Sequence, residues 1–181
     1  PHFLNRMAAR LAPKNNMAAN IIHCELFFPE SQGTVSSLHG GGPLKGLSYG
    51  IYWQGQVFKV PKRFSRQDYI FKTISISGLQ KEKMQTFLEQ QVGCGFNNLG
   101  YVSFLAPGCC RMSGHLPGLA KRYYCSQLTM AALNHGGVFG KDGMGNDVHL
   151  PTLVHPQEVF HLIDDYATMT SHPIRQGALK L

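Results

Sequence analysis

The sequence predicts an α+β domain in which a small antiparallel sheet packs against helices. Short runs that are rich in β-branched and aromatic residues predict strands at 20–28, 47–53, 56–60 and 69–76. Helical spacing of apolar residues predicts helices at 79–91, 122–134 and 157–166. The strands and helices do not alternate as regular βαβ units, which favours α+β over a parallel α/β sheet.

The four predicted strands differ in how clearly they are delimited. The run at 20–28 (NIIHCELFF) is rich in Ile and Phe, and Pro29 stops it. The runs at 47–53 and 56–60 are joined near Gln54–Gly55, which indicates a hairpin. Residues 69–76 alternate apolar and polar side chains as a further strand.

The predicted helices have recognisable ends. The helix at 79–91 is followed by Gly93, and Gly136 ends the helix at 122–134. A shorter helix at 157–166 follows Pro156. The apolar residues of the first helix that we expect on or near one side are Leu79, Met84, Phe87, Leu88 and Val92.

The remaining segments divide the chain into a domain with two flanking pieces. Residues 1–19 form an N-terminal helical extension, since 3–11 has helical spacing that Pro13 ends. The folded domain covers 20–170, and 171–181 is a C-terminal tail. Within the domain we expect a long loop at 30–46, which contains GGGP and could fold over a cleft, and a loop with little regular structure at 94–120.

Composition bounds the class of protein. The chain has 181 residues, of which 43% are hydrophobic, enough for one domain with one core. No apolar run approaches the roughly 18 residues needed to span a bilayer. The segment 1–20 carries basic residues but no apolar core, so we do not expect a secretory signal.

The net charge of +7 favours anionic partners such as a membrane surface, a nucleic acid or an acidic substrate. The basic residues are scattered, however, and a solvated surface explains most of them. The tightest group is Lys59, Lys62, Arg63 and Arg66. The chain has no stripe of Lys and Arg interleaved with aromatic residues, which disfavours nucleic-acid binding.

The five cysteines are Cys24, Cys94, Cys109, Cys110 and Cys125. An odd count with no regular spacing is a poor disulfide framework and predicts a reducing, cytoplasmic location, which would be the host-cell cytoplasm if the chain is viral. Cys109 and Cys110 with His115 could suggest zinc, but no CxxC pair accompanies them. We therefore expect no metal and no cofactor.

The strand at 20–28 carries the first chemically suggestive pattern. Side chains alternate along a strand, so Ile22, Cys24, Leu26 and Phe28 share a wholly apolar face. The other face places His23 and Glu25 between Ile21 and Phe27, as at the floor of a cleft. The alternative is a half-buried His and Glu that neighbouring groups satisfy.

The start of the helix at 122–134 carries the second pattern. Cys125 falls in the first turn, where the helix dipole stabilises a thiolate and lowers the thiol pKa. Lys121 and Arg122 add positive potential, and Leu128, Ala131 and Ala132 share the buried side of Tyr124. The alternative is a small buried cysteine that only packs.

Together these patterns point to nucleophilic catalysis, because a reactive thiol needs a base and the base needs an orienting group. The other cysteines fit this role less well. Cys24 points to the apolar face, and Cys94, Cys109 and Cys110 fall in predicted loops without a helix start.

The segments HCELFF (23–28), FLEQQVGCGFNNLGYVSF (87–104) and YYCSQLTMAAL (123–133) resemble the circularly permuted branch of the NlpC-type papain-like superfamily. In that branch the His strand precedes the Cys helix. It includes YiiX-like bacterial proteins, relatives of lecithin retinol acyltransferase and predicted poxvirus enzymes. The resemblance covers roughly residues 20–166, and this chain departs from it in the GGGP loop and the histidine-rich segment 135–161.

The resemblance implies a permuted papain-like catalytic domain with Cys125 as nucleophile and His23 as base. Glu25 is the candidate third member, although two same-face strand residues are about 6.5 Å apart at Cα, so its side chain must reach along the strand. In many members the orienting group lies on the following strand, where Ser48, Gln54 or Gln56 could serve.

These inferences predict a cysteine hydrolase or acyltransferase that cleaves an amide or ester through a thioester, with a peptide or a lipid acyl group as substrate. Peptide-type amides are slightly preferred because that chemistry is commoner in the superfamily. The alternative function is a binding or virulence module that keeps the fold without turnover.

Overall fold

A computed structural model describes residues 21–30, 44–64, 69–103, 120–140, 146 and 148–171. The predicted N-terminal extension, the GGGP loop, the cysteine pair 109–110 and nearly all of the C-terminal tail lie outside these residues. No helix in the described part of the chain is both long and apolar enough to cross a membrane.

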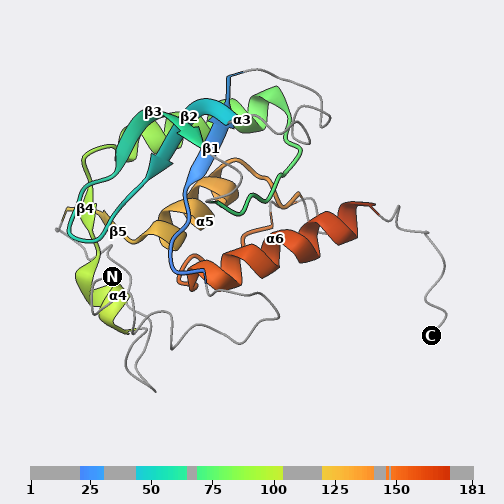
Figure 1. Cartoon of the computed structure of the whole chain (residues 1–181). Coiled ribbons are helices and arrows are strands. Elements are labelled where there is room, and N and C mark those ends of the chain that lie inside the picture. The colour runs from blue at the N-terminus through green and yellow to red at the C-terminus, as the bar shows by residue number, and fades with distance from the viewer. Residues whose placement is uncertain are drawn as a thin grey trace, which may run out of the picture.

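The main sheet has three antiparallel strands in the order β1–β2–β3, as Figure 1 shows. These strands are β1 (Leu26–Pro29), β2 (Leu44–Gly50) and β3 (Phe58–Phe64). Leu26 pairs with Tyr49, and Leu47 lies between Phe28 and Pro61 in the register. The structure thus confirms a mixed α+β class with a small antiparallel sheet.

The hairpin predicted around Gln54 and Gly55 is present between β2 and β3. The Gly55 N–H donates to the carbonyl of Tyr52 over 2.9 Å. Gln54 adopts a left-handed conformation with φ of 59°, which is uncommon for a residue other than glycine. The strands are offset from the predicted runs, since β2 ends at Gly50 and β3 continues to Phe64.

The segment predicted to be a loop at 94–120 contains regular structure in its described parts. β4 (Gly95–Phe96) pairs in parallel with β5 (Arg122–Tyr123), and α4 (Asn98–Ser103) follows β4. The prediction of little regular structure was therefore wrong there. These elements are too short to show a periodic pattern in the sequence. The two strands are stabilised by pairing between segments that are distant in the chain rather than by local sequence.

The helix predicted at 79–91 is confirmed as α3 (Gly78–Gln91). Ser77 caps it, accepting from the Gln80 N–H while the Gln80 side chain accepts from the Ser77 N–H. Its buried apolar residues are Met84 and Leu88. Leu79 and Val92 are exposed, so the buried side is narrower than predicted.

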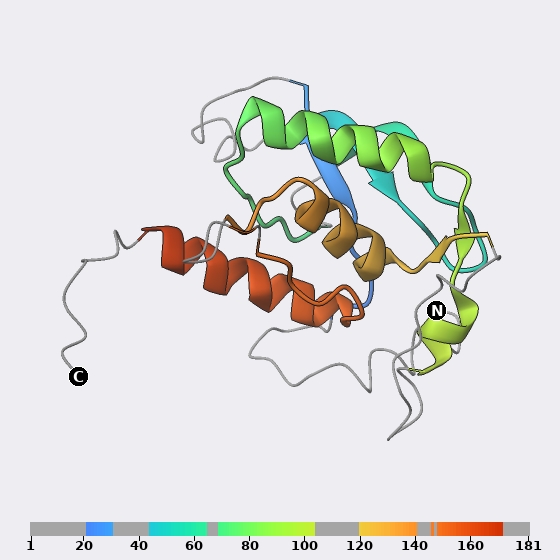
Figure 2. The ribbon, with the colours of Figure 1, turned by 180° about the vertical axis from the view of Figure 1, so that it is seen from behind.

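The centre of the fold is α5 (Cys125–His135). It contacts α3, β2 and α6 (Pro156–Ser171), and Figures 1 and 2 show it between the sheet and α6. Its side chains are buried almost all round, including Leu128, Met130 and Leu133. A helix so enclosed has little freedom to shift, so its first residue is held firmly.

Three predicted boundaries were wrong. The helix at 122–134 begins only at Cys125, because residues 122–123 pair as β5. The strand at 20–28 begins only at Leu26, and the described residues 21–25 are a non-strand lead-in. The helix at 157–166 is longer, extending over 156–171.

Residues 69–76 form no strand, contrary to the alternation in their sequence. Tyr69 and Ile70 are exposed, and Tyr69 packs edge-on against Phe64 at the end of β3. Alternation alone does not make a strand where no neighbouring strand supplies hydrogen bonds.

Candidate active site

Cys125 is the first residue of α5, with Tyr124 as N-cap. Its side chain is buried, with 4% of the residue exposed. The Cys125 N–H is among the first-turn N–H groups that have no acceptor within a helix, and the positive end of the helix dipole lies here. The position can therefore stabilise negative charge both on the sulfur and on an oxygen bound beside it.

His23 reaches this helix start from the lead-in to β1. The Ile21 N–H donates to Oε1 of Gln157 over 3.0 Å. Gln157 is fully buried near the start of α6, so this bond ties the lead-in to a rigid helix. A third of the His23 side chain remains exposed, which leaves one side of the ring open to a substrate.

Glu25 lies directly behind the imidazole. His23 Nε2 is 3.1 Å from Glu25 Oε1, so the carboxylate reaches back along the chain as the prediction required. Gly50 on β2 makes room for it, since a Cβ at Gly50 would lie 2.9 Å from Cγ of Glu25. Because Nε2 faces Glu25, Nδ1 is the ring nitrogen left for the thiol.

The Glu25 carboxylate collects hydrogen bonds from three further side chains. Ser48 donates to Oε2 over 2.5 Å and Tyr52 donates to Oε1 over 2.7 Å. Lys62 Nζ donates to both oxygens, over 2.8 and 2.6 Å. Burial alone would raise the pKa of Glu25, but these bonds and that of His23 outweigh it and lower the pKa to about 2.

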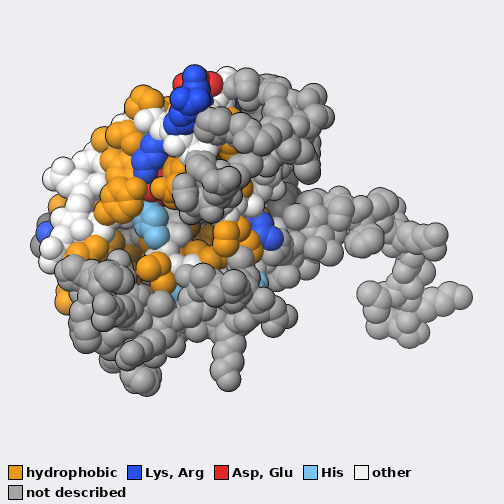
Figure 3. Space-filling view, in the orientation of Figure 1, with side chains coloured by type: hydrophobic (Ala, Val, Ile, Leu, Met, Phe, Trp, Pro, Cys, Tyr) orange, Lys and Arg blue, Asp and Glu red, His pale blue; other side chains and the backbone are white. Residues whose placement is uncertain are grey.

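Lys62 is itself held among aromatic rings. Its Nζ lies 4.6 Å from the Phe58 ring centroid and 5.2 Å from that of Tyr52, within cation–π range. Burial would lower the pKa of Lys62, but Glu25 and Tyr52 raise it. Figure 3 shows histidine and basic side chains next to one another among hydrophobic ones on this face.

The Cys125 thiol and the His23 imidazole lie near enough for each to shift the pKa of the other. Burial would lower the pKa of His23, but its hydrogen bonds with Cys125 and Glu25 raise the pKa to about 9. The pKa of the Cys125 thiol is lowered, by hydrogen bonding from Cys24 first and then from His23. Both shifts favour a thiolate–imidazolium pair over the neutral thiol and imidazole.

Sequence reasoning missed Cys24. It packs against the core as predicted, yet its sulfur also lies 3.5 Å from the hydroxyl oxygen of Thr129 on α5. The pKa of the Cys24 thiol is raised, first by Cys125 and then by burial, while Cys24 lowers the pKa of Cys125. The adjacency of Cys24 to His23 was the signal, but the strand alternation pointed the other way.

Sequence reasoning also missed Tyr52, Lys62 and Tyr101. Tyr52 stacks on the His23 ring, with centroids 4.9 Å apart. Tyr101 is buried, and burial together with the negative charge of Cys125 raises the pKa of Tyr101 to about 12. No sequence motif identifies them, because β2–β3 and α4 bring them to the site only in the folded chain.

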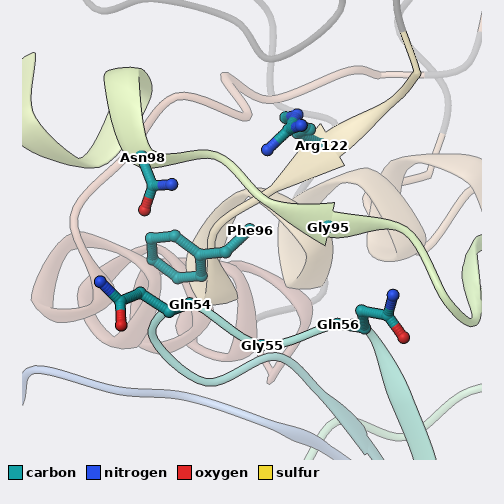
Figure 4. A pocket seen from close by; sticks show the side chains of 7 residues that line it. All are labelled: Gln54, Gly55, Gln56, Gly95, Phe96, Asn98 and Arg122. Carbon is teal, nitrogen blue, oxygen red and sulfur yellow. The ribbon is translucent and has the colours of Figure 1, made fainter.

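Gln54 and Gln56, the alternatives for the third role, lie elsewhere. They line a cavity of about 300 Å³ with Asn98 and Arg122, and Figure 4 shows the two glutamines across it from the other two residues. Among the described residues neither glutamine hydrogen-bonds to His23. Ser48, the third alternative, contacts Glu25 rather than the imidazole.

Metal ligands do not gather in the described ranges, where no three His, Cys, Asp or Glu side chains are placed to hold an ion. Cys109, Cys110 and His115 lie outside those ranges. Chemically, the site combines a thiol of lowered pKa, an imidazole of raised pKa and a carboxylate held by hydrogen bonds.

Comparisons of the chain with protein-family models, with curated protein sequences and with solved structures find no match.

Proposed function

We propose that this protein is a cysteine-dependent hydrolase or acyltransferase that cleaves an amide or ester bond through a thioester at Cys125. The observation that carries the proposal is the His23 ring, whose Nε2 lies 3.1 Å from Oε1 of Glu25 and whose pKa is raised by the Cys125 thiol as well as by Glu25. This line of thiol, imidazole and carboxylate has the geometry of an activated nucleophile.

In the proposed mechanism the Cys125 thiolate attacks the carbonyl carbon and the carbonyl oxygen becomes an oxyanion. The backbone N–H of Cys125 at the helix start is a natural donor to that oxyanion. The His23 imidazolium then gives its proton to the leaving amine or alcohol as the thioester forms. Neutral His23 next takes a proton from water or from an acceptor, which attacks the thioester and frees Cys125.

Glu25 keeps the imidazole oriented and favours its protonated form. Because Lys62, Ser48 and Tyr52 hold the carboxylate, it does not need to move or take up a proton during the cycle. A buried, fully hydrogen-bonded carboxylate of this kind supports the base through its charge and its position.

The finer fold assignment belongs to this proposal. A His-bearing segment that enters a sheet and precedes a Cys-bearing helix is the order of a circularly permuted papain-like domain. The antiparallel sheet beside α5 supports that assignment.

Peptide-type amides remain the preferred substrate, with lipid acyl esters second. An anionic membrane surface remains a proposed partner on the strength of the positive net charge alone. The apolar neighbours of His23 support either substrate, although the ring stacked on it is Tyr52 rather than the predicted Phe27, which packs on Phe64.

The test is to incubate the protein with an acyl activity-based probe, with peptide amides and with phospholipid vesicles, each beside Cys125→Ala. Cys94→Ala is the matched control, since Cys94 is a half-buried thiol with no described bond to His23. Turnover that Cys125→Ala abolishes and Cys94→Ala retains would support the proposal. Release from lipid alone would overturn the peptide preference, and no Cys125-dependent turnover would favour the binding-module alternative.

A further inference from the structure

The pair of thiols at the start of α5 has a geometry that acyl transfer does not require. Cys24 and Cys125 are both free thiols at this helix start, and each shifts the pKa of the other. A nucleophile needs only one base, and His23 already supplies it. The second thiol therefore calls for a separate explanation.

Thr129 fixes Cys24 against the same helix. Its hydroxyl oxygen lies 3.5 Å from the Cys24 sulfur and donates to the Cys125 carbonyl over 3.0 Å. Cys24 is thus attached to the first turn of α5 by a contact that is independent of Cys125. A disulfide between the two cysteines requires their sulfurs to approach to about 2.05 Å.

We propose that Cys24 is a resolving cysteine, which traps oxidised Cys125 as a reversible Cys24–Cys125 disulfide. The oxidant is a hydroperoxide. The Cys125 thiolate attacks one peroxide oxygen, the O–O bond breaks, and the departing oxygen leaves as water or an alcohol after protonation. Cys125 is thereby oxidised to a sulfenic acid and the peroxide is reduced.

In the second step the Cys24 sulfur attacks the Cys125 sulfur. The S–O bond breaks, and the hydroxide that leaves takes the Cys24 thiol proton to form water. No further oxidant is needed. A dithiol reductant reverses the reaction by thiol–disulfide exchange and restores both thiols.

The disulfide protects the nucleophile as well as blocking it. A low-pKa thiolate without a nearby thiol is oxidised onward to sulfinic and sulfonic acids, which thiol reductants do not reverse. Cys24 intercepts the sulfenic acid before that stage. This inference rests on the proposed function for its biological meaning, but the disulfide forms whether or not the protein turns over a substrate.

Trypsin makes the experiment direct, because each thiol of the pair falls alone in one peptide. The tryptic peptide 15–45 contains Cys24 as its only cysteine, and the peptide 123–141 contains only Cys125. The other three cysteines all fall in the peptide 84–111. The full chain is treated with hydrogen peroxide, its remaining thiols are alkylated, and the tryptic peptides are analysed by mass spectrometry with and without dithiothreitol.

We expect peptides 15–45 and 123–141 to be joined after peroxide, with a loss of two hydrogens, and to separate with dithiothreitol. In Cys24→Ser, Cys125 should instead gain two or three oxygens that dithiothreitol does not remove. Cys94→Ser should behave like the unmodified protein, because Cys94 is not part of the pair.

Irreversible oxidation of Cys125 at the same rate in the unmodified protein and in Cys24→Ser would overturn the inference. So would a cross-link that joins 123–141 to 84–111 instead of 15–45. The tryptic peptides of the unmodified protein show which cysteines are cross-linked even if Cys24→Ser fails to fold. A disulfide in a protein without turnover would leave this inference standing while the proposed function fails, and turnover without the disulfide would do the reverse.

Discussion

The ring of Tyr52 stacks on the ring of His23, with centroids 4.9 Å apart and 23° between the planes. The Tyr52 hydroxyl donates to Oε1 of Glu25, the same oxygen that faces His23 Nε2. Tyr52 therefore fixes both the plane of the imidazole and the oxygen that orients it. Because Tyr52 holds the face of the imidazole and Glu25 holds Nε2, the orientation of Nδ1 is fixed as well.

Replacing the carboxylate tests this arrangement. In Glu25→Gln the charge that stabilises imidazolium is lost, so the pKa of His23 should fall from about 9. We expect kcat/KM to fall by about 10²- to 10⁴-fold with a normal circular dichroism spectrum, since the imidazole loses its orientation and its preferred proton position. A fall in kcat/KM with an unchanged His23 titration would mean that Glu25 acts by another route.

The glutamines of the hairpin provide the control for that result. Gln54→Ala and Gln56→Ala should retain activity, because both side chains line the polar cavity rather than the imidazole. If Glu25→Gln stayed fully active while either glutamine variant failed, the third role would belong to the strand after the hairpin.

The pH dependence of the thiol follows from the two shifted groups. The thiolate exists above the lowered pKa of Cys125, and the imidazolium is lost as pH rises through about 9. Iodoacetamide should therefore label Cys125 at pH values well below those at which an ordinary free thiol reacts. Activity that needs the imidazolium proton should decline near pH 9.

Removing the imidazole should shift the pH at which iodoacetamide labels Cys125. His23→Ala takes away a hydrogen bond and a positive charge, so the pKa of Cys125 should rise and labelling should shift to higher pH. Cys94 is the internal reference in the same sample. Equal labelling of Cys125 and Cys94 across the pH range would count against an activated nucleophile.

The sequence predicted the helices better than the strands, and the reason is physical. α3 carries its own signals, a capping serine and an apolar stripe that contains Met84 and Leu88. Residues 69–76 carry strand-like alternation but form no strand, and no strand in the described ranges pairs with them. A strand is made by its partner, so its existence depends on contacts that the local pattern does not contain.

The residues of the candidate site fall into two similar groups, those that a local sequence pattern identifies and those that only the folded chain brings together. His23, Glu25 and Cys125 could be predicted because each lies in a segment with a local pattern. Lys62 and Tyr52 could not, because they reach Glu25 only through the β2–β3 hairpin. Cys24 packs against the core as its alternation predicts, but its influence on Cys125 arises only in the folded chain.

Acid stability should report on Glu25. Its pKa is lowered from 4.5 to about 2 in the folded protein. The carboxylate therefore contributes stability that is fully present above its unfolded pKa and is lost as pH falls from about 4.5 towards 2. The shift corresponds to about 3 kcal/mol at most. Urea unfolding at pH 7, 5, 4 and 3 should show a progressive fall in the free energy of unfolding.

Lys62→Met should weaken that dependence, because it removes the positive charge that pairs with Glu25 while keeping an unbranched apolar side chain among the aromatic rings. Lys59→Met is the matched control. Lys59 pairs with Glu89, but both side chains are two-fifths exposed, and exposed ion pairs contribute little. Acid profiles that change equally in the two variants would show that Lys62 does not hold Glu25 as the structure indicates.

The polar cavity should select among substrates. Its lining includes Arg122, three residues before Cys125 in the sequence, and Gln54, two residues after Tyr52. For a peptide substrate that carries a carboxylate beside the scissile amide, Arg122→Ala should raise KM about 10-fold or more with little change in kcat, as expected when a charge-assisted contact is removed.

Lys121→Ala is the control, since Lys121 is an adjacent exposed cation that does not line the cavity. The measurement is kcat and KM for matched substrates with a carboxylate or an amide at that position. An equal effect of the two variants would reduce the role of Arg122 to general surface charge, and an effect on kcat alone would place Arg122 in the positioning of the reacting groups instead.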